Sequence, residues 1–239
     1  MGLAEEIRGA LVGYADEKRA EGSLRFFKTG PGEYGEGDRF IGVTVPQQRK
    51  VARAYVQRAG LDDIEELLAD DVHEYRLTAL LLLVLKYQKA QTELEKEKIV
   101  HLYLQNTHKV NNWDLVDSSA DKILGAYLFD KDKNILYKLA GSENQWEQRI
   151  SVIATFYFIR QGEFENTLRI ARILLEHPHD LIHKAVGWML REVGKRDFDT
   201  EVAFLKEHYP QMPRTMLRYA IEKFDPSLRT AFLQGNIKP

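Results

Sequence analysis

The feature that most constrains the fold is a weak repeat of helix-forming segments. Apolar residues recur at spacings of three and four over most of the chain, as in helices that bury one face. Five segments align on an equivalent position, which is Arg76, Val116, Arg149, Lys184 and Arg218, at steps of 40, 33, 35 and 34 residues. A period of this length filled by helix pairs predicts an all-α, curved α-solenoid whose concave face is a natural binding surface.

We expect one helical-repeat domain over residues 1–239, with N-terminal helices and a glycine-rich loop to about residue 60 and repeats over 61–239. Helices are expected over 3–20, 46–59, 62–69, 72–88, 91–107, 111–128, 132–140, 144–160, 164–176, 179–194, 198–208, 213–223 and 226–234. Only RFIGVTV, at 39–45, is suited to an extended strand. The glycine-rich segment TGPGEYGEGD, at 29–38, lacks the features of a phosphate or dinucleotide loop, so it is either a surface loop or a loop on the substrate side.

Composition excludes several classes of protein. The chain has no cysteine, which rules out disulfides and cysteine-based metal sites. Its longest apolar stretch, LTALLLLVL at 77–85, is too short for a bilayer and predicts a buried helix. With no secretory signal in the N-terminal sequence, a cytoplasmic protein that does not enter membranes is expected. The net charge of −2 disfavours nucleic-acid binding unless positive charge gathers on one face.

The equivalent position of the repeats offers such a face. Four of its five residues are Arg or Lys, so one helix per repeat would direct a cation to the same side of a solenoid. Those cations would then line a single groove. The alternative is a solvated outer row of charges, or ion pairs with the preceding helix.

The next position along is occupied by Leu77, Asp117, Ile150, Ala185 and Tyr219, and the carboxylate is the exception. Burying an unpaired carboxylate is costly, so Asp117 either has a partner or a capping role, or it is a functional group in a partly dry cleft. Trp113 lies four residues earlier and therefore on the same helix face. Trp188 shares a face with Lys184 and Arg191, as a core residue or as a platform for a ligand.

Four segments in order, FFKTGPGEYGEGDRFIGVTVPQQRKVAR, WDLVD, QWEQR and KAVGWMLRE, resemble the AlkD-like DNA alkylation-repair glycosylases over roughly residues 23–223. The resemblance implies HEAT-like repeats that hold duplex DNA on the concave face. It also implies release of alkylated purines such as 3-methyladenine and 7-methylguanine. The expected site residues are Asp117, Trp113 and Trp188 at the reaction centre, and Arg49, Arg149, Lys184, Arg191, Arg218 and Phe26 against the DNA. Phe26 stands where the family places a tyrosine.

The implied chemistry needs few groups. A purine alkylated at N3 or N7 is cationic and leaves as a neutral base, so no general acid is required and one carboxylate suffices where glycosidases use two. We expect no cofactor and no metal site, because His177, His179 and His183 form no known metal motif. The expected partner of a monomer is duplex DNA. The alternatives are a relative that binds DNA without excision and a helical-repeat scaffold for a protein partner.

Overall fold

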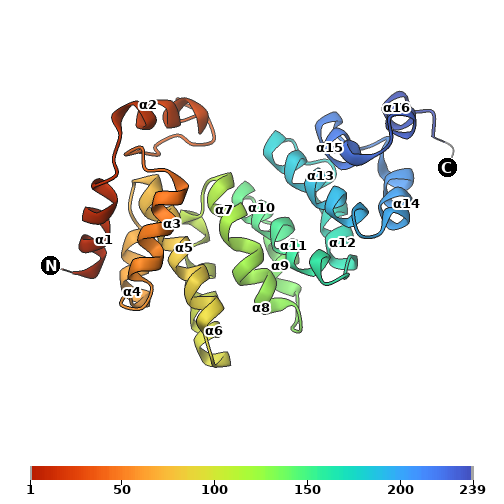
Figure 1. The fold of residues 1–239 in the computed structure, drawn as a ribbon. Helices are drawn as coiled ribbons and strands as arrows, with labels where there is room; N and C mark the ends of the chain where they lie inside the picture. Colours follow the sequence, from red (N-terminus) through yellow and green to blue (C-terminus); the bar gives the residue numbers. More distant parts are fainter. Residues whose placement is uncertain (1, 238–239) are drawn as a thin grey trace. The chain divides into compact units, whose positions relative to one another are not determined.

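The computed structural model describes residues 2–237 and forms two compact units, one ending at Ser119 and the other beginning at Ala120 (Figure 1). No strand occurs among the described residues, and extended pairing is limited to one isolated bridge between Arg39 and Val72. The prediction of an all-α fold is confirmed. A single domain over residues 1–239 stays a prediction, and its terminal residues 1, 238 and 239 lie outside the described range.

The first unit is built around α5, a long helix that is buried on almost all sides. Its helices are α1 (Leu3–Val12), α2 (Glu17–Phe26), α3 (Val45–Tyr55), α4 (Leu61–Leu68), α5 (His73–Lys89), α6 (Glu93–Gln105), the 3₁₀ turn η1 (Thr107–Lys109) and α7 (Trp113–Ala120). Helices α3, α4 and α6 all pack on α5, and α1 packs on α3 and α4. The buried face of α5 includes the whole run 77–84, as expected for this apolar segment. No described helix has the length and apolarity needed to cross a membrane.

The prediction of a single helix over residues 3–20 is wrong, because this segment contains parts of two helices. Helix α1 ends at Val12, and α2 begins at Glu17 and runs to Phe26. Between them Asp16 takes an extended backbone, and its carboxylate accepts from the Arg19 N–H. The Asp16 N–H donates to Ile41 O, a contact from a distant part of the chain. In Figure 1, α2 runs crosswise to the helices below it in the first unit.

The segment between α2 and α3 is pinned to the beginning of α5. Arg39 pairs with the residues before that helix, since its N–H donates to Asp71 O and its carbonyl accepts from His73 N–H. The buried carboxylate of Glu74 then accepts the backbone N–H groups of Ile41, Gly42 and Val43. This carboxylate satisfies three backbone donors that would otherwise be buried without partners.

The second unit is organised around α13. It contains the π-helical turn η2 (Asp121–Gly125), α8 (Ala126–Leu128), α9 (Asn134–Ala140), α10 (Gln145–Ala154), α11 (Phe156–Arg160), α12 (Glu165–Ile173), α13 (Asp180–Gly194), α14 (Phe198–His208), α15 (Arg214–Ala220), the 3₁₀ turn η3 (Ile221–Lys223) and α16 (Pro226–Gln234). Helix α13 packs on α10, α12, α14 and α15. The helices that carry Arg149, Lys184 and Arg218 are therefore consecutive neighbours, as the repeat alignment predicts.

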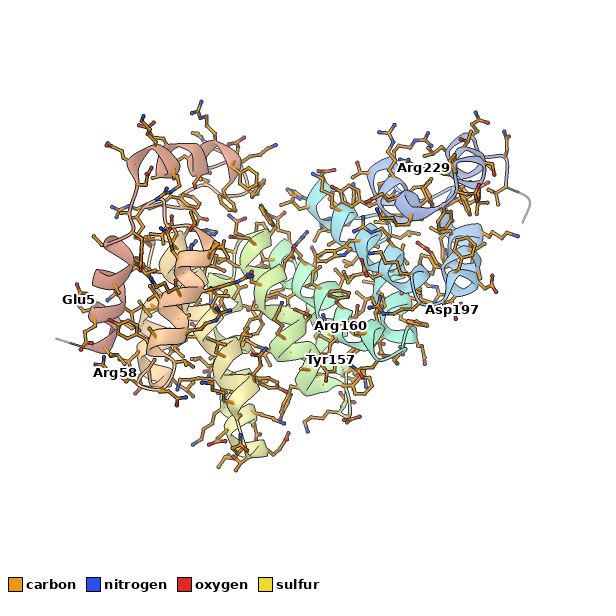
Figure 2. The ribbon with its side chains drawn as sticks, in the orientation of Figure 1. Glu5, Arg58, Tyr157, Arg160, Asp197 and Arg229 are labelled. Atoms are coloured by element: carbon orange, nitrogen blue, oxygen red, sulfur yellow. The ribbon has the colours of Figure 1, made fainter. Side chains whose placement is uncertain are left out.

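Two other predicted helices are interrupted. The predicted helix 111–128 widens into the π-helical turn η2, where Gly125 lies so close to α10 that an added Cβ would be 2.1 Å from Ala154 O. The predicted helix 144–160 breaks at Thr155, whose hydroxyl donates to Val152 O. At the end of α11 the Arg160 guanidinium lies over the ring of Tyr157 (Figure 2). It also bonds the buried Asp121 at 2.8 Å, which ties α11 to η2.

Candidate active site

The first turn of α7 is fixed to the rest of the first unit by Asn112. This side chain is fully buried, and its Oδ1 accepts the N–H of Trp113 at 2.9 Å. Its Nδ2 donates to Asp38 Oδ2 at 3.1 Å. Asn112 therefore caps the helix and connects it to the end of the glycine-rich segment.

His73, the first residue of α5, lies between two carboxylates. Its Nδ1 is 3.0 Å from Asp38 Oδ2, and its Nε2 is 2.8 Å from Asp114 Oδ2 on α7. Arg76 reaches the other oxygen of Asp38 at 2.5 Å. Burial alone would lower the pKa of His73, but the charges and hydrogen bonds of Asp114 and Asp38 outweigh it and raise the pKa to about 9. At neutral pH the ring is therefore an imidazolium that donates from both nitrogens.

The pKa of Asp38 moves in the complementary direction. Burial would raise the pKa of this carboxyl, but hydrogen bonds from His73 and Asn112 and the charges of Arg76 and His73 hold it below its usual value. Asp38 is thus an anion inside the fold, surrounded by donors from α5 and from the residue before α7. We call His73, Asp38, Asp114, Arg76 and Asn112 the His73 cluster.

Four aromatic rings connect His73 of this cluster to the surface. Phe27, Phe40 and His73 lie in mutual contact, with ring centroids 4.7 to 5.0 Å apart. Phe27 also stacks on Trp113 at 5.5 Å, with the planes 22° from parallel. Phe26 meets Trp113 edge-on at 5.9 Å and is 64% exposed. The structure therefore brings together two predicted site residues that are 87 positions apart in sequence, Phe26 and Trp113.

Asp117 lies one helical turn after Trp113 and is partly exposed, as Trp113 is. The other side of the helix is anchored in the core, because Leu115 and Val116 are fully buried. At the equivalent positions of other repeats, Leu77, Ile150 and Ala185 are buried as expected. Tyr219 is instead 36% exposed, since this end of α15 reaches the surface. Asp117 is thus a carboxylate near the surface, on a helix whose opposite face is held rigidly.

A cavity of about 400 Å³ opens beside these rings. Its walls come from α2, the segment before α3, and α5, and include Phe26, Phe27, Phe40 and His73. Asp114 contributes the part of the wall that belongs to α7. This hollow gives the first unit a concave aromatic surface next to Trp113.

The second unit holds the other predicted aromatic, Trp188, on α13. Its indole Nε1 donates to Glu192 at 3.2 Å, and its ring lies 5.6 Å from that of Phe156. Arg191 on the same helix forms an ion pair with Glu222 and lies 4.0 Å from the buried Glu192. Trp188 and Arg191 are both partly exposed and both held by carboxylates.

The predicted DNA-contacting cations differ in their surroundings. Arg149 is only 5% exposed and donates to Leu181 O at 2.5 Å, at the start of α13. Lys184 forms an ion pair with Asp180 on its own helix at 2.6 Å. Arg49 and Arg218 are exposed, and neither forms an ion pair with any residue in the described part of the chain. The aligned position of the repeats therefore holds cations in different surroundings. Arg76 and Arg149 are buried, Lys184 is paired, and Arg218 is exposed.

The three clustered histidines serve local structure. His177 Nε2 bonds Gln148 Oε1 at 2.7 Å, and its Nδ1 accepts the N–H of His179. His183 contacts the carbonyl of His177. Within residues 2–237 no group of three or more metal-binding side chains has a geometry suited to a metal ion.

The comparison with protein families decides which family this is. The sequence model of the family described as DNA alkylation repair enzyme matches residues 7–224. The chain belongs to this DNA alkylation repair family. No curated protein matches the sequence.

Solved structures of other chains resemble this fold at low sequence identity. A predicted DNA alkylation repair enzyme from Enterococcus faecalis is 17% identical, with a TM-score of 0.69 over 89% of this chain and 97% of its own. AlkD2 from Streptococcus mutans is 18% identical, with a TM-score of 0.57 over 76% and 91%. A protein called smu.31 from Streptococcus mutans UA159 is 17% identical, with a TM-score of 0.54 over 94% and 100%. At these identities the likeness shows a shared fold.

Sequence reasoning about this family member missed the His73 cluster. A usable signal was present, because HEYR precedes the apolar run LTALLLLVL. His73, Glu74 and Arg76 lie at the beginning of a helix that is buried on almost all sides, so their ionisable side chains must find partners. Their partners were not visible, because Asp38 and Asp114 lie 35 and 41 residues from His73 in sequence.

Proposed function

We propose that this member of the DNA alkylation repair family is a DNA glycosylase that releases cationic N3- or N7-alkylated purines from duplex DNA. One observation carries the proposal. Trp113 and Asp117 lie one turn apart on α7, both reach the surface, and the first turn of that helix is fixed by a buried cap. An aromatic face and a carboxylate at a rigid position are the two groups that this chemistry requires.

In the proposed reaction the bond between C1′ and the purine nitrogen breaks, and its electron pair goes to the base. The base loses its positive charge and leaves neutral, so no group has to protonate it. The deoxyribose becomes oxocarbenium-like, and the Asp117 carboxylate stabilises that charge. A water then adds at C1′ and gives up a proton, which leaves an abasic site. One preorganised electrostatic group of this kind contributes roughly 10²–10³ in rate.

Trp113 provides selectivity for the charged base. A cation near the face of an indole gains about 0.5–2 kcal/mol, which a neutral purine does not receive. The stack on Phe27 and the edge contact with Phe26 leave the indole little freedom to turn. The nearby Phe26 is exposed, so it adds apolar surface for the DNA to contact.

The other carboxylate on α7 has a structural role in this proposal. Asp114 is bonded to the imidazolium of His73, and its side chain is 13% exposed. Its charge is therefore neutralised within the fold. Asp117, partly exposed and one turn after Trp113, is the carboxylate that acts on the deoxyribose in this proposal.

Binding of the duplex would rely on individual cations of each unit, in a chain whose overall charge is −2. Arg218 and Arg49 are exposed and suited to phosphate contacts. Lys184 and Arg191 would exchange carboxylate partners for phosphates, which lowers their net contribution. Arg149 as a backbone contact, and Trp188 as a second aromatic at the lesion, stay predictions from the family resemblance.

The proposal is tested by identifying what the protein releases from methylated duplex DNA. We expect chromatography to show 3-methyladenine or 7-methylguanine, together with abasic sites in the DNA. Duplex binding without any released base would mean that this is a DNA-binding relative that lacks excision. Absence of duplex binding at low salt would favour a scaffold for a protein partner.

A further inference from the structure

His73 is buried, yet its contacts lead to the elements that carry the proposed site. It is 2% exposed and bonds the loop before α3 through Asp38 and helix α7 through Asp114. Its ring also touches Phe27, which stacks on Trp113. The two hydrogen bonds of this histidine go to two distant segments. His73 therefore joins three parts of the fold, which are α5, the loop before α3, and α7.

We propose that His73 is a positioning residue for base excision, because it locks α7 and the Phe27–Trp113 stack into the one arrangement that presents Trp113 and Asp117 together. The proposal rests on the function proposed above and adds a residue that does not itself reach the DNA.

The first route from His73 to the site is polar. Asn112, Trp113 and Asp114 are consecutive, and all three are fixed through the cluster. Asp114 bonds Nε2 of His73, while Asn112 bonds Asp38, which in turn bonds Nδ1. The backbone of Trp113 is then held by the cap from Asn112. A shift of His73 would be transmitted to the turn that sets the direction of both site side chains.

The second route is aromatic. The His73 ring lies 4.8 Å from that of Phe27, and Phe27 lies 5.5 Å from Trp113. Phe40 stacks on both rings, with its centroid 5.0 Å from that of Phe27 and 4.7 Å from that of His73. An imidazolium against these rings gains cation–π attraction, so its charge also strengthens the packing under Trp113.

The protonation of His73 should therefore be visible at the site. The charged groups that face it are Asp38 from the loop, Asp114 from α7 and Arg76 from its own helix. Near pH 9 the ring loses a proton, and one nitrogen then faces a carboxylate without a hydrogen to donate. Because the folded pKa lies above the ordinary value of about 6.5, the stabilisation is complete below that pH and is lost as pH rises through about 9.

The first test measures the single-turnover rate of 7-methylguanine release from about pH 6.5 to 9.8. The proposed reaction needs no general acid, so an alkaline fall with a midpoint near 9 that is absent in His73→Gln would report His73 and not alkaline chemistry of the base itself. Asp114→Asn removes one carboxylate charge but keeps an oxygen acceptor. It should move the midpoint down by about one pH unit or more. If His73 only supported the fold, Asp114→Asn would change the melting temperature but would leave the midpoint of the pH–rate profile at its wild-type position.

The second test uses His73→Gln, which should lower the single-turnover rate by roughly 10- to 100-fold through loss of alignment. Affinity for lesion-containing duplex should stay within about threefold, because His73 does not reach the surface. His208→Gln is the matched control, since His208 also lies against a phenylalanine ring, 4.5 Å from Phe204, but belongs to the second unit. A His73→Gln rate equal to that of the control, in a folded protein, would overturn the proposal.

A third measurement stands apart from activity. In ¹⁵N spectra of the unliganded wild type, the Trp113 indole resonance, assigned with Trp113→Phe, should shift with a midpoint near pH 9. The shift should vanish in His73→Gln. If wild type released no base but this shift were present, the proposed function would fail while the mechanical link remained. An indole resonance that does not respond to His73 would overturn the link, whatever the activity.

Discussion

The indole of Trp113 stacks on the ring of Phe27, with centroids 5.5 Å apart and planes 22° from parallel. This contact joins α7 to the end of α2, two helices that are separated by most of the first unit's sequence. It places Phe26, the preceding residue and the last of α2, at the edge of the same indole. The N-terminal segment thus completes the surroundings of the proposed site.

Phe26→Ala is expected to affect DNA binding more than stability. The side chain is 64% exposed, so its loss should change the free energy of unfolding by only about 0.5 kcal/mol. An exposed ring beside Trp113 is, however, suited to contact a nucleotide, and stacking of a base on an aromatic ring contributes about 1–3 kcal/mol. Affinity for lesion-containing duplex, measured by fluorescence anisotropy, should fall by about tenfold.

Leu94→Ala is the control for this change, because Leu94 is also an apolar residue of the first unit and is 60% exposed. Equal losses of DNA affinity in the two variants would show that Phe26 makes no special contact.

The predicted DNA-contacting arginines should separate into two classes. Arg218 is exposed, so Arg218→Ala should weaken binding to lesioned and plain duplex alike and reduce the salt dependence by about one phosphate contact. Arg149 is buried and bonds Leu181 O, so Arg149→Ala should also destabilise the protein, by about 1–3 kcal/mol. Titrations at several salt concentrations, together with thermal unfolding, distinguish the two effects.

Arg229→Ala provides the comparison for Arg218, since Arg229 is an exposed cation of the same unit and its loss changes the net charge equally. If Arg229→Ala weakened binding as much as Arg218→Ala, the loss would reflect overall charge and not a phosphate contact at Arg218.

Glu201 on α14 should make stability depend on pH. Burial raises the pKa of this carboxyl to about 8, and Arg191 opposes the shift only in part. Because the folded pKa lies above the ordinary value, the folded state loses stability as pH rises from about 4.5 toward 8. Glu201→Gln should therefore raise the melting temperature at pH 8.5, by an amount of the order of 5 °C.

The gain from Glu201→Gln should shrink as pH falls toward 4.5 and disappear at about pH 3, where the wild-type carboxyl is neutral in both states. Glu201→Met serves as a second variant that has no amide to satisfy. A melting temperature that is lower than wild type at pH 8.5 in both variants would show that the ionised carboxylate stabilises the fold.

The repeat and the buried helix could be predicted because their signals are periodic and local. Seven of the eight residues in the run 77–84 are apolar, with Thr78 as the exception, so apolar side chains surround the helix and the run is buried accordingly. The break at Asp16 gave no such signal, since it depends on a hydrogen bond from its N–H to Ile41 O, across 25 residues. Periodicity reports which face is buried, but not which distant carbonyl will end a helix.

The residues of the proposed site stay predictions, and the sequence indicates only part of their surroundings. The spacing of Trp113 and Asp117 places them on one helix face, and both are partly exposed there. Equivalent positions in the alignment did not mean equivalent surroundings, because Arg76 and Arg149 turn into the fold while Arg218 faces solvent. The sequence distinguishes a cation from an apolar residue, whereas its exposure depends on the neighbouring helix.

The most direct measurement is the single-turnover rate of 7-methylguanine release by Asp117→Asn, compared with wild type. The change keeps the volume of the side chain but removes the charge that opposes the oxocarbenium. We predict a rate lower by roughly 10²-fold or more, with DNA affinity and melting temperature close to wild type on the same preparation. A near-normal rate in a protein with a lowered melting temperature would mean that Asp117 serves the fold and not the reaction.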